Sequence, residues 1–473
     1  MTAARKSKSI RKVLIANRGA AAARIVRAVQ GLGLKPVVVY SEADAQLPYV
    51  EQAAESYCIG PAPAKQSYLD QGALLDCMRR SGADALHPGY GFLSENAAFA
   101  QCVEEAGHCF IGPSPKWIEL LGHKARARDF MGRMGLALGG SSAVLPANDM
   151  QAVHTAARQL GFPVLIKPAG GDGGIGMFPV HSSDELDGAW LRASALAEKA
   201  FSDPSLYLER FVQAPRHIEF QFLADRHGHV MSLFERDCST QRRYQKVIEE
   251  SPAPRLDRAV LQNMGEQLER MLANVGYDVI GTVEMLYTPE SGFSFLEVNT
   301  RLQVEHAVTE AVTGTDIVQA QIRLAAGERL AEVMPVRPAL NGHAIEARIY
   351  AEDPVRFFPS PGMLKVFQFP DNVPGIRVET GYAQGNAVTS HYDPMVSKLI
   401  AHGRTRDEAA LRLRSALAAT RIEGIKTNIP MIERVLGSAR FGDAAMTVDG
   451  LQAALAEQAQ TSINPTVEAK ETV

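Results

Sequence analysis

The spacing of apolar positions over residues 10–125 predicts alternating strands and helices. Short apolar runs such as 12–16 alternate with segments of helical length near 20–33 and 70–81. This alternation is typical of a parallel sheet with crossover helices, in which ligands gather at the carboxyl ends of the strands. Two polar segments, 17–19 and 87–91, follow predicted strands at that edge. Neither is a GxGxxG fingerprint, so the pattern does not support a nicotinamide dinucleotide site.

The predicted pattern of helices and strands changes twice along the rest of the chain. Helices predicted near 149–161 and 184–200 enclose two strand-like runs and a glycine-rich loop, and short alternating strands follow. After residue 343 strands and helices are mixed, with a helix predicted near 407–420, and the polar segment from 456 lacks periodicity. The fold class is therefore α/β followed by α+β. The predicted units are 10–125, 126–205, 206–335, 336–455 and a disordered tail, 456–473.

Composition narrows the class of protein. With 473 residues, 46% of them hydrophobic, the chain can bury several cores, and its net charge of −4 offers no basic surface for nucleic acid. No apolar run is long enough to span a bilayer. None of the five cysteines forms a CxxC pair, so the sequence shows neither a zinc knuckle nor a redox motif, and the odd number of cysteines in a long chain indicates a reducing compartment. The basic segment 1–12 leads directly into a strand-like run, so we expect no transit peptide and a cytoplasmic protein.

The segment 297–305 carries the strongest chemical signal. If it is extended throughout, the side chains of Glu297, Asn299, Arg301, Gln303 and Glu305 share one face. Such a face is costly to bury without a ligand, although a solvated edge strand is the usual explanation of alternating polarity. A second carboxylate strand precedes it and contains Glu284. Carboxylate and amide oxygens suit Mg²⁺ better than zinc, so these strands predict a magnesium site.

Two further segments are less specific. Lys167 ends a predicted strand and is followed by five glycines within seven residues, a loop that could cover phosphates or be a plain flexible hairpin. The charged run 235–246 is either a solvated face or a set of cations that fixes an anion, with Lys246 as a candidate. His217 and Glu219 share a strand face. Cys238 is expected to be a buried thiol.

Together these motifs resemble the biotin carboxylase subunits of biotin-dependent carboxylases. The resemblance runs in order from about residue 10 to 450. It is carried by IANRGAAAARI, ALHPGYGFLSEN, ERDCSTQRRYQKVIEESPAP, FLEVNTRLQVEHAVTE, GHAIEARIYAED and HYDPMVSKLI. It implies a Rossmann-like N-terminal domain, an ATP-grasp B lid with a central ATP-grasp domain, and a C-terminal biotin carboxylase domain. It also implies MgATP (or MnATP) and bicarbonate as substrates, with biotin attached to a carrier.

The resemblance assigns roles to residues by position. The residues that would bind ATP are Lys124, Lys167, Gly173, Gly174, Glu209, Arg210, Val212, His217, Gln241 and Tyr244. Glu284, Glu297 and Asn299 would hold the metal, and Lys246, Arg301, Gln303 and Val304 would bind bicarbonate. Glu305 would be the base, while Arg348 and Asp393 would form the biotin site.

The sequence departs from the family pattern at several positions. Ala20 replaces a glutamate, His123 an aspartate, Ile175 an arginine, Ala307 a proline, and Asp172 interrupts the glycine run. Tyr49 and Tyr244 stand where histidine is common. These departures concern the lid, the nucleotide site and dimer contacts.

The chain shows no Met-Lys-Met biotinylation motif. The resemblance therefore implies a separate biotin carboxyl carrier protein, a carboxyltransferase partner and a homodimer. An acetyl-CoA or other acyl-CoA carboxylase of fatty acid biosynthesis is the expected setting, although the sequence leaves the final acceptor open. Two alternatives remain: another ATP-grasp ligase that traps an acyl phosphate with an amine, and a non-catalytic scaffold or regulator.

Overall fold

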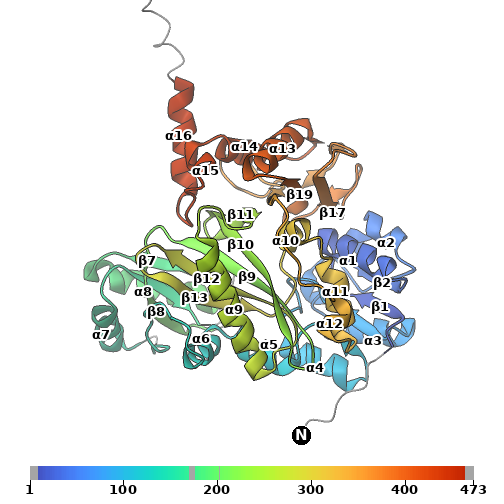
Figure 1. The fold of residues 1–473 in the computed structure, drawn as a ribbon, viewed down its shortest axis with the longest axis horizontal. Coiled ribbons are helices and arrows are strands. Elements are labelled where there is room, and N and C mark those ends of the chain that lie inside the picture. Colours follow the sequence, from blue (N-terminus) through green and yellow to red (C-terminus); the bar gives the residue numbers. More distant parts are fainter. Residues whose placement is uncertain (1–8, 147, 170–175, 202, 464–473) are drawn as a thin grey trace, which may run out of the picture.

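The computed structural model describes residues 9–146, 148–169, 176–201 and 203–463 (Figure 1). A five-stranded parallel sheet forms the N-terminal unit, in the order β3-β2-β1-β4-β5. Its strands are β1 (Lys12–Ile15), β2 (Lys35–Tyr40), β3 (Glu55–Cys58), β4 (Ala85–His87) and β5 (Cys109–Phe110). Its helices are α1 (Gly19–Gly31), α2 (Pro48–Gln52), α3 (Gln71–Ser81), α4 (Ala97–Glu105) and α5 (Pro115–Gly122), with short 3-10 turns at Glu42–Asp44 and Ala64–Gln66.

The strand order of this sheet reverses between β1 and β4, which is the place where such sheets bind ligands. The two predicted polar segments meet there. The Asn17 side chain donates hydrogen bonds to the carbonyl oxygens of Pro88 (2.7 Å) and Tyr90 (2.8 Å). The parallel sheet was therefore predicted correctly, and the two polar segments meet at the edge where we expect a ligand.

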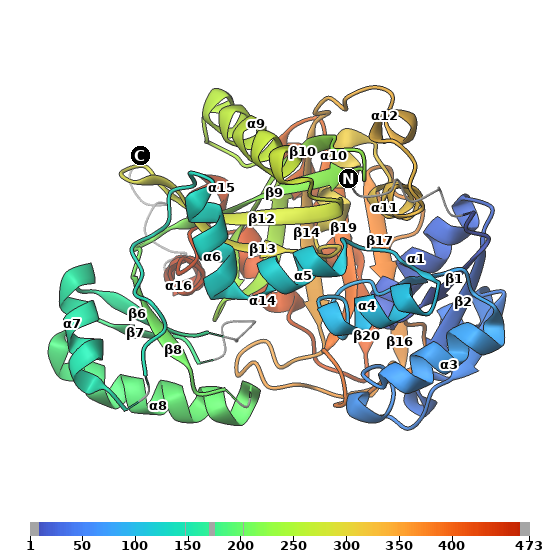
Figure 2. The ribbon, with the colours of Figure 1, turned by 90° about the horizontal axis from the view of Figure 1, so that it is seen from below.

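A small lid unit follows α6 (Lys124–Arg133). It is an antiparallel sheet in the order β7-β6-β8, packed on two helices through a core that includes Trp190 (Figure 2). Its elements are α7 (Met150–Leu160), β6 (Val164–Pro168), β7 (Phe178–Val180), α8 (Ser183–Phe201) and β8 (Leu206–Arg210). Because β8 pairs with β6, the predicted boundary at 205/206 is wrong, and the lid continues to residue 210. The sequence grouped β8 with the strands that follow it, since all of them are short and alternating.

One eight-stranded antiparallel sheet forms the centre of the molecule, in the order β13-β12-β9-β10-β11-β14-β19-β17. Its strands are β9 (Arg216–Ala224), β10 (Val230–Arg242), β11 (Gln245–Ser251), β12 (Val279–Thr288), β13 (Gly292–Asn299), β14 (His343–Tyr350), β17 (Ile376–Thr380) and β19 (Met395–Gly403). The strands on both sides of the predicted boundary at 335/336 belong to this sheet, because β11 pairs with β14. The central and C-terminal units are therefore joined by backbone hydrogen bonds.

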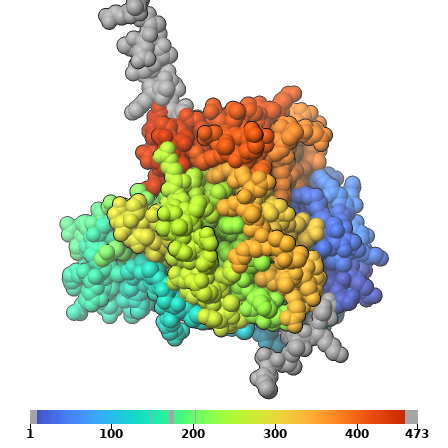
Figure 3. Space-filling model, in the orientation of Figure 1, coloured from blue at the N-terminus to red at the C-terminus, as the bar shows by residue number. Residues whose placement is uncertain are grey.

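Helices and small two-stranded ribbons cover this sheet. The helices are α9 (Arg258–Val275), α10 (His306–Thr313), α11 (Ile317–Ala325), α12 (Leu330–Val333), α13 (Arg406–Ala419), α14 (Ile429–Leu436), α15 (Ala439–Gly442) and α16 (Leu451–Ile463). The ribbons pair β15 (Gly362–Met363) with β18 (Ala387–Val388), and β16 (Val366–Gln368) with β20 (Arg421–Glu423). In Figure 3 the lid and the N-terminal unit lie on opposite sides of the central unit, with the C-terminal helices above it.

The predicted disordered tail is wrong over 456–463, because α16 continues to Ile463. The sequence of this helix, LQAALAEQ and onward, is rich in strong helix formers, although its polarity suggested a loose end. The remainder of the tail, residues 464–473, lies outside the described residues. Among the described residues, no helix has the length and hydropathy needed to cross a membrane.

Candidate active site

A cavity of about 930 Å³ lies where the lid, the large sheet and the edge of the N-terminal sheet meet. It collects most of the predicted site residues: Lys124, Lys167, Glu209, Arg210, Val212, His217, Gln241, Tyr244, Lys246, Glu284, Glu297, Arg301, Gln303, Val304, Glu305, Arg348 and Asp393. Asn299 is not among the residues that line the cavity, but its side chain contacts two residues that are, Glu284 and Arg301. Gly173 and Gly174, like Asp172 and Ile175, lie outside the described residues. The cavity therefore brings together side chains that are far apart in the sequence.

The segment 297–305 reaches the cavity by a different path from the one predicted. β13 ends at Asn299, residues 300–305 form a turn, and α10 begins at His306, so extension does not persist to Glu305. The turn nevertheless gathers its polar groups. Arg301 donates hydrogen bonds to the side-chain oxygens of Asn299 (2.8 Å) and Gln303 (3.1 Å). The polar residues thus converge because the chain curls around Arg301, and strand alternation places only Glu297 and Asn299.

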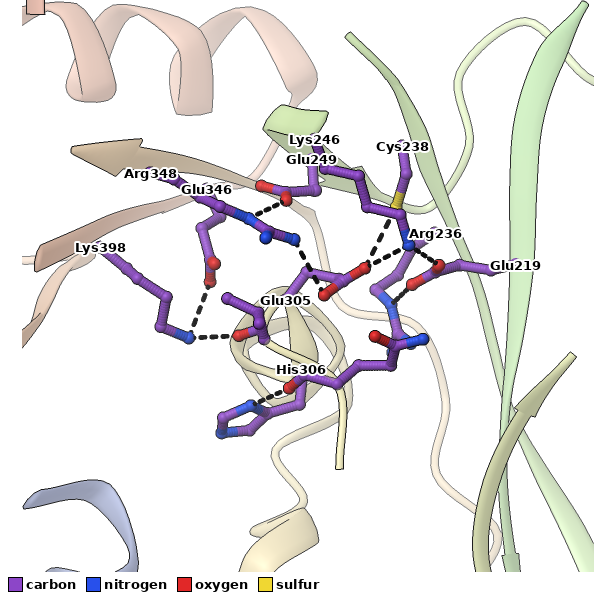
Figure 4. Close-up of polar contacts among 12 residues, drawn as sticks. Glu219, Arg236, Cys238, Lys246, Glu249, Glu305, His306, Glu346, Arg348 and Lys398 are labelled. Carbon is purple, nitrogen blue, oxygen red and sulfur yellow. Dashed lines mark hydrogen bonds and ion pairs between the residues drawn. The ribbon is translucent and has the colours of Figure 1, made fainter. Parts of the chain in front are cut away.

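Lys246 connects three buried carboxylates. Its ammonium lies 2.6 Å from Glu219 and 2.7 Å from Glu305 (Figure 4), and 2.8 Å from Glu284. Burial lowers the pKa of Lys246, but the three carboxylates outweigh burial and hold the pKa well above its ordinary value. The charged run 235–246 is thus not a solvated face, because its β10 residues are buried. Cys238 is the buried thiol that we predicted, and burial raises its pKa well above the usual value.

Arg348 holds the other oxygen of Glu305. It donates to Glu305 Oε2 at 3.1 Å and to Glu249 Oε1 at 2.5 Å. Burial raises the pKa of Glu305, but Lys246, Arg348 and Arg236 together bring it well below the ordinary range, so this carboxylate is ionised at neutral pH. Glu249, which shares Arg348 and faces Glu305, has its pKa raised to about 7, first by burial and then by the charge of Glu305, against the effect of Arg348.

The predicted metal ligands sit on neighbouring strands. Glu284 and Glu297 are direct partners across β12 and β13, and Thr282 is the partner of Asn299. Like charges placed opposite each other destabilise a sheet unless cations compensate them. Here Lys124 lies 3.4 Å from Glu297, while Lys246 and His217 (2.8 Å) contact Glu284. The two carboxylates line the cavity and the Asn299 amide lies beside them, and together they form a set of hard oxygen donors that fits Mg²⁺.

The opposite end of the cavity lies under the lid. Lys167 is paired with Glu209 at 3.0 Å, and Arg128 holds the second oxygen of Glu209 at 2.9 Å. Gln241 contacts His217 Nδ1 at 2.9 Å. Tyr244 lies in the β10–β11 turn, where it adopts a φ of 67°. The guanidinium of Arg210 does not enter this group, because it binds the carbonyl of Leu160.

Asp393 lines the cavity close to Arg348. Its neighbour Tyr392 contacts the Ser41 hydroxyl at 2.6 Å and stacks with Arg18 at 4.3 Å, which fastens this loop to the N-terminal unit. Of the residues that depart from the family pattern, Ala20 lines the cavity, and Tyr49, on α2, is buried in a core that it shares with β1 and α1.

Sequence reasoning missed two long-range contacts of the active-site turn. Glu95 of the N-terminal unit accepts hydrogen bonds from Arg301 Nε (2.8 Å) and from the Thr300 backbone (3.1 Å). Lys398 of β19 donates to the Val304 carbonyl. Glu95 is part of a recognised motif, and Lys398 is a charged residue inside an apolar strand (MVSKLIAHG), which was the available signal.

Comparison with known proteins gives a consistent picture along the chain. Residues 9–118 match the family model "Biotin carboxylase, N-terminal domain", and residues 346–453 match "Biotin carboxylase C-terminal domain". Residues 123–333 match "Carbamoyl-phosphate synthase L chain, ATP binding domain". A biotin carboxylase of Halalkalibacterium halodurans is 49% identical over 91% of this chain and 95% of its own length. The alpha subunit of rat methylcrotonoyl-CoA carboxylase is 43% identical over 92% of this chain but 60% of its own length.

Solved structures of biotin carboxylases are also similar to this chain. The biotin carboxylase domain dimer of Hydrogenobacter thermophilus 2-oxoglutarate carboxylase, in complex with MgADP, ADP and bicarbonate, has a TM-score of 0.90 at 40% identity and covers 94% of this chain and 97% of its own. Campylobacter jejuni biotin carboxylase in a β,γ-ATP complex also has a TM-score of 0.90, at 38% identity, and covers 94% and 99%.

Proposed function

Because this chain belongs to the biotin carboxylase family, we propose that its cavity carboxylates biotin with MgATP and bicarbonate through the residues described above. The observation that carries the residue assignment is the position of Glu305, whose two oxygens are held by Lys246 and Arg348 inside one cavity. Both cations are oriented by further carboxylates, Glu219 and Glu249. A base and two anion-binding cations are therefore positioned before any substrate enters.

Lys246, Arg301 and Gln303 bind bicarbonate, and Glu305 removes its proton. The cations that depress the pKa of Glu305 would otherwise make it a poor base. When Lys246 turns to the bicarbonate oxygens, Glu305 loses part of this stabilisation and becomes more basic, so binding and proton transfer are coupled. The deprotonated bicarbonate then attacks the γ-phosphorus of ATP, giving carboxyphosphate and ADP.

At the nucleotide end, Lys124 and Lys167 face the phosphates, and Glu284, Glu297 and Asn299 hold Mg²⁺. A bound Mg²⁺ supplies charge neutralisation on the phosphoryl oxygens. Lys167 and Lys124 already approach carboxylates in the described structure, Glu209 and Glu297. We therefore expect both lysines to exchange these partners for phosphate oxygens when ATP binds.

At the biotin end, Arg348 stabilises the enolate of the ureido group and Asp393 contacts it. Carboxyphosphate breaks down to CO₂ and phosphate, and that phosphate takes the N1′ proton before the nitrogen captures CO₂. The biotin arrives on a carrier protein, and a carboxyltransferase passes the carboxyl group to its acceptor, which we expect to be acetyl-CoA or another acyl-CoA. A homodimer in the cytoplasm is the expected form.

The test is ADP release by the purified chain with MgATP, bicarbonate and free biotin. We expect turnover that requires bicarbonate and increases with biotin. In Glu305→Gln, which keeps the size of the side chain, turnover should fall by about a hundredfold or more because the base is lost. Glu290→Gln, at an exposed position in the β12–β13 turn, is the control and should retain full activity. Bicarbonate-independent ATP hydrolysis would refute the proposal.

A further inference from the structure

The turn that carries Gln303, Val304 and Glu305 is held from behind by two buried side chains that have no part in the chemistry described so far. His306 Nδ1 contacts the Gln303 carbonyl oxygen at 2.7 Å, and the Lys398 ammonium donates to the Val304 carbonyl oxygen. In Figure 4 Lys398 lies to the left of Glu305 and His306 below it, whereas Lys246 and Glu219 lie to its right. The carbonyls of this turn are thus bound on the side away from Lys246.

A trans peptide points its C=O and the following N–H in opposite directions. Both peptides of the turn are trans, since the cis bonds of the described residues precede Pro163 and Pro252. With the Gln303 and Val304 carbonyls directed backwards, the N–H groups of Val304 and Glu305 must point the other way, and both residues line the cavity. Within the part of the chain that the structure describes, neither N–H has a hydrogen-bond acceptor. Consecutive free amides of this kind form an anion-binding nest.

The two side chains are suited to this task. A carbonyl oxygen can only accept, so His306 must carry its proton on Nδ1. Burial lowers the pKa of His306 well below its usual value, and the nearby charge of Lys398 acts in the same direction, so the ring stays neutral. Lys398 has no solvent exposure and lies 2.9 Å from Glu379 and 3.4 Å from Glu346. Its positive charge polarises the Val304–Glu305 peptide, which makes the Glu305 N–H a stronger donor.

We propose that Lys398 and His306 are positioning residues that aim the Val304 and Glu305 amides at the bicarbonate. This inference rests on the proposed function, since it assigns how that site holds its anion. Glu346 and Glu379 hold the Lys398 ammonium in position through their ion pairs with it. The amides then add two backbone donors to the side-chain donors of Lys246 and Arg301.

The test uses pairs of variants. His306→Asn retains an N–H close to the Nδ1 position, whereas His306→Leu removes it at similar volume. Lys398→Met removes the ammonium, and Lys398→Met/Glu379→Gln does the same while restoring the balance of buried charge. Misfolding of Lys398→Met alone would therefore leave three variants to decide the question.

We expect the bicarbonate KM to rise about tenfold or more in His306→Leu and in both Lys398 variants, since a hydrogen bond to a charged group is worth about 1.5–3 kcal/mol. His306→Asn should stay within about threefold of the unaltered chain, and the Kd of MgATP should be unchanged throughout. A purely structural role would lower Tm and weaken ATP binding together. Folded variants with an unchanged bicarbonate KM would overturn the inference.

A binding readout separates this inference from the proposed function. Tm is measured with increasing bicarbonate at constant ionic strength, with chloride as the balancing anion. If the unaltered chain and His306→Asn are stabilised by bicarbonate while His306→Leu is not, the amide nest stands even if ADP release fails. If ADP release depends on bicarbonate but all variants respond alike, the proposed function stands and the amide nest is refuted.

Discussion

Glu250 offers a quantitative test of how the large sheet joins the two halves of the active site. It follows Glu249 on β11 and points to the opposite face of the sheet. There its carboxylate binds His343 Nε2 at 2.8 Å and Arg406 at 2.6 and 3.0 Å, and both partners belong to the C-terminal unit. Burial raises the pKa of Glu250, but the hydrogen bonds from His343 and Arg406 outweigh burial and lower the pKa to about 2. These contacts therefore stabilise the folded state.

The size and pH dependence of the effect follow from that shift. Against an unfolded-state pKa of about 4.3, a folded-state pKa near 2 corresponds to ~3 kcal/mol at neutral pH. Because the folded-state pKa is the lower one, this stabilisation is complete above about pH 5. It is lost as the pH falls from about 4.3 towards 2, with about half gone near pH 3.3.

Glu250→Gln should lower the free energy of unfolding by about 3 kcal/mol at pH 7, and by less as the pH drops below about 4.3. Urea unfolding followed by circular dichroism, at a series of pH values, measures this difference. Arg406→Met should show the same pH dependence, since it removes the main charged partner of the same carboxylate. A loss below about 1 kcal/mol at pH 7, or one that does not change with pH, would refute the reasoning.

Three further predictions concern catalysis. Lys246→Met should lower bicarbonate-dependent ADP release by about a hundredfold or more, because three carboxylates lose their shared cation. A rate within tenfold of that of the unaltered chain would contradict this prediction. Arg348→Met should reduce the stimulation of ADP release by biotin about a hundredfold. The bicarbonate-dependent rate without biotin should stay within about tenfold of that of the unaltered chain, and assays with and without biotin measure the two rates separately. Glu95→Gln should raise the bicarbonate KM about tenfold with little change in Tm, because the Arg301 guanidinium loses its charged partner and is held less firmly. An unchanged KM would mean that Asn299 and Gln303 alone fix that guanidinium.

Much of the site was predictable because its chemistry is concentrated in short segments. Glu297, Asn299 and Arg301 lie within five residues of one another, and hard oxygen ligands beside a guanidinium are rare in a buried strand. The parallel N-terminal sheet was predictable for a similar reason, since alternation of strands and helices is a local property. The path from Arg301 to Glu305 was not, because an alternating pattern of polar residues describes a strand and a curled turn equally well.

The contacts that sequence analysis missed join residues that are far apart in the sequence. Glu95 and Thr300 are separated by 205 residues, and Lys398 and Val304 by 94. No local pattern records such a pairing. The joining of the central and C-terminal units in one sheet was not predictable for the same reason, because strand pairing between β11 and β14 is invisible in the alternation of either strand.

The shared sheet has a mechanistic consequence. Lys246, the proposed bicarbonate cation, belongs to β11, and Arg348, the proposed biotin cation, belongs to β14; these two strands are adjacent in the same sheet. Both cations touch the same carboxylate, Glu305. A CO₂ molecule released at one would therefore meet the biotin nitrogen at the other without any rearrangement of the central and C-terminal units. The lid sheet is not part of this sheet, so substrate entry and exclusion of water can be left to lid movement while the two reaction centres stay fixed.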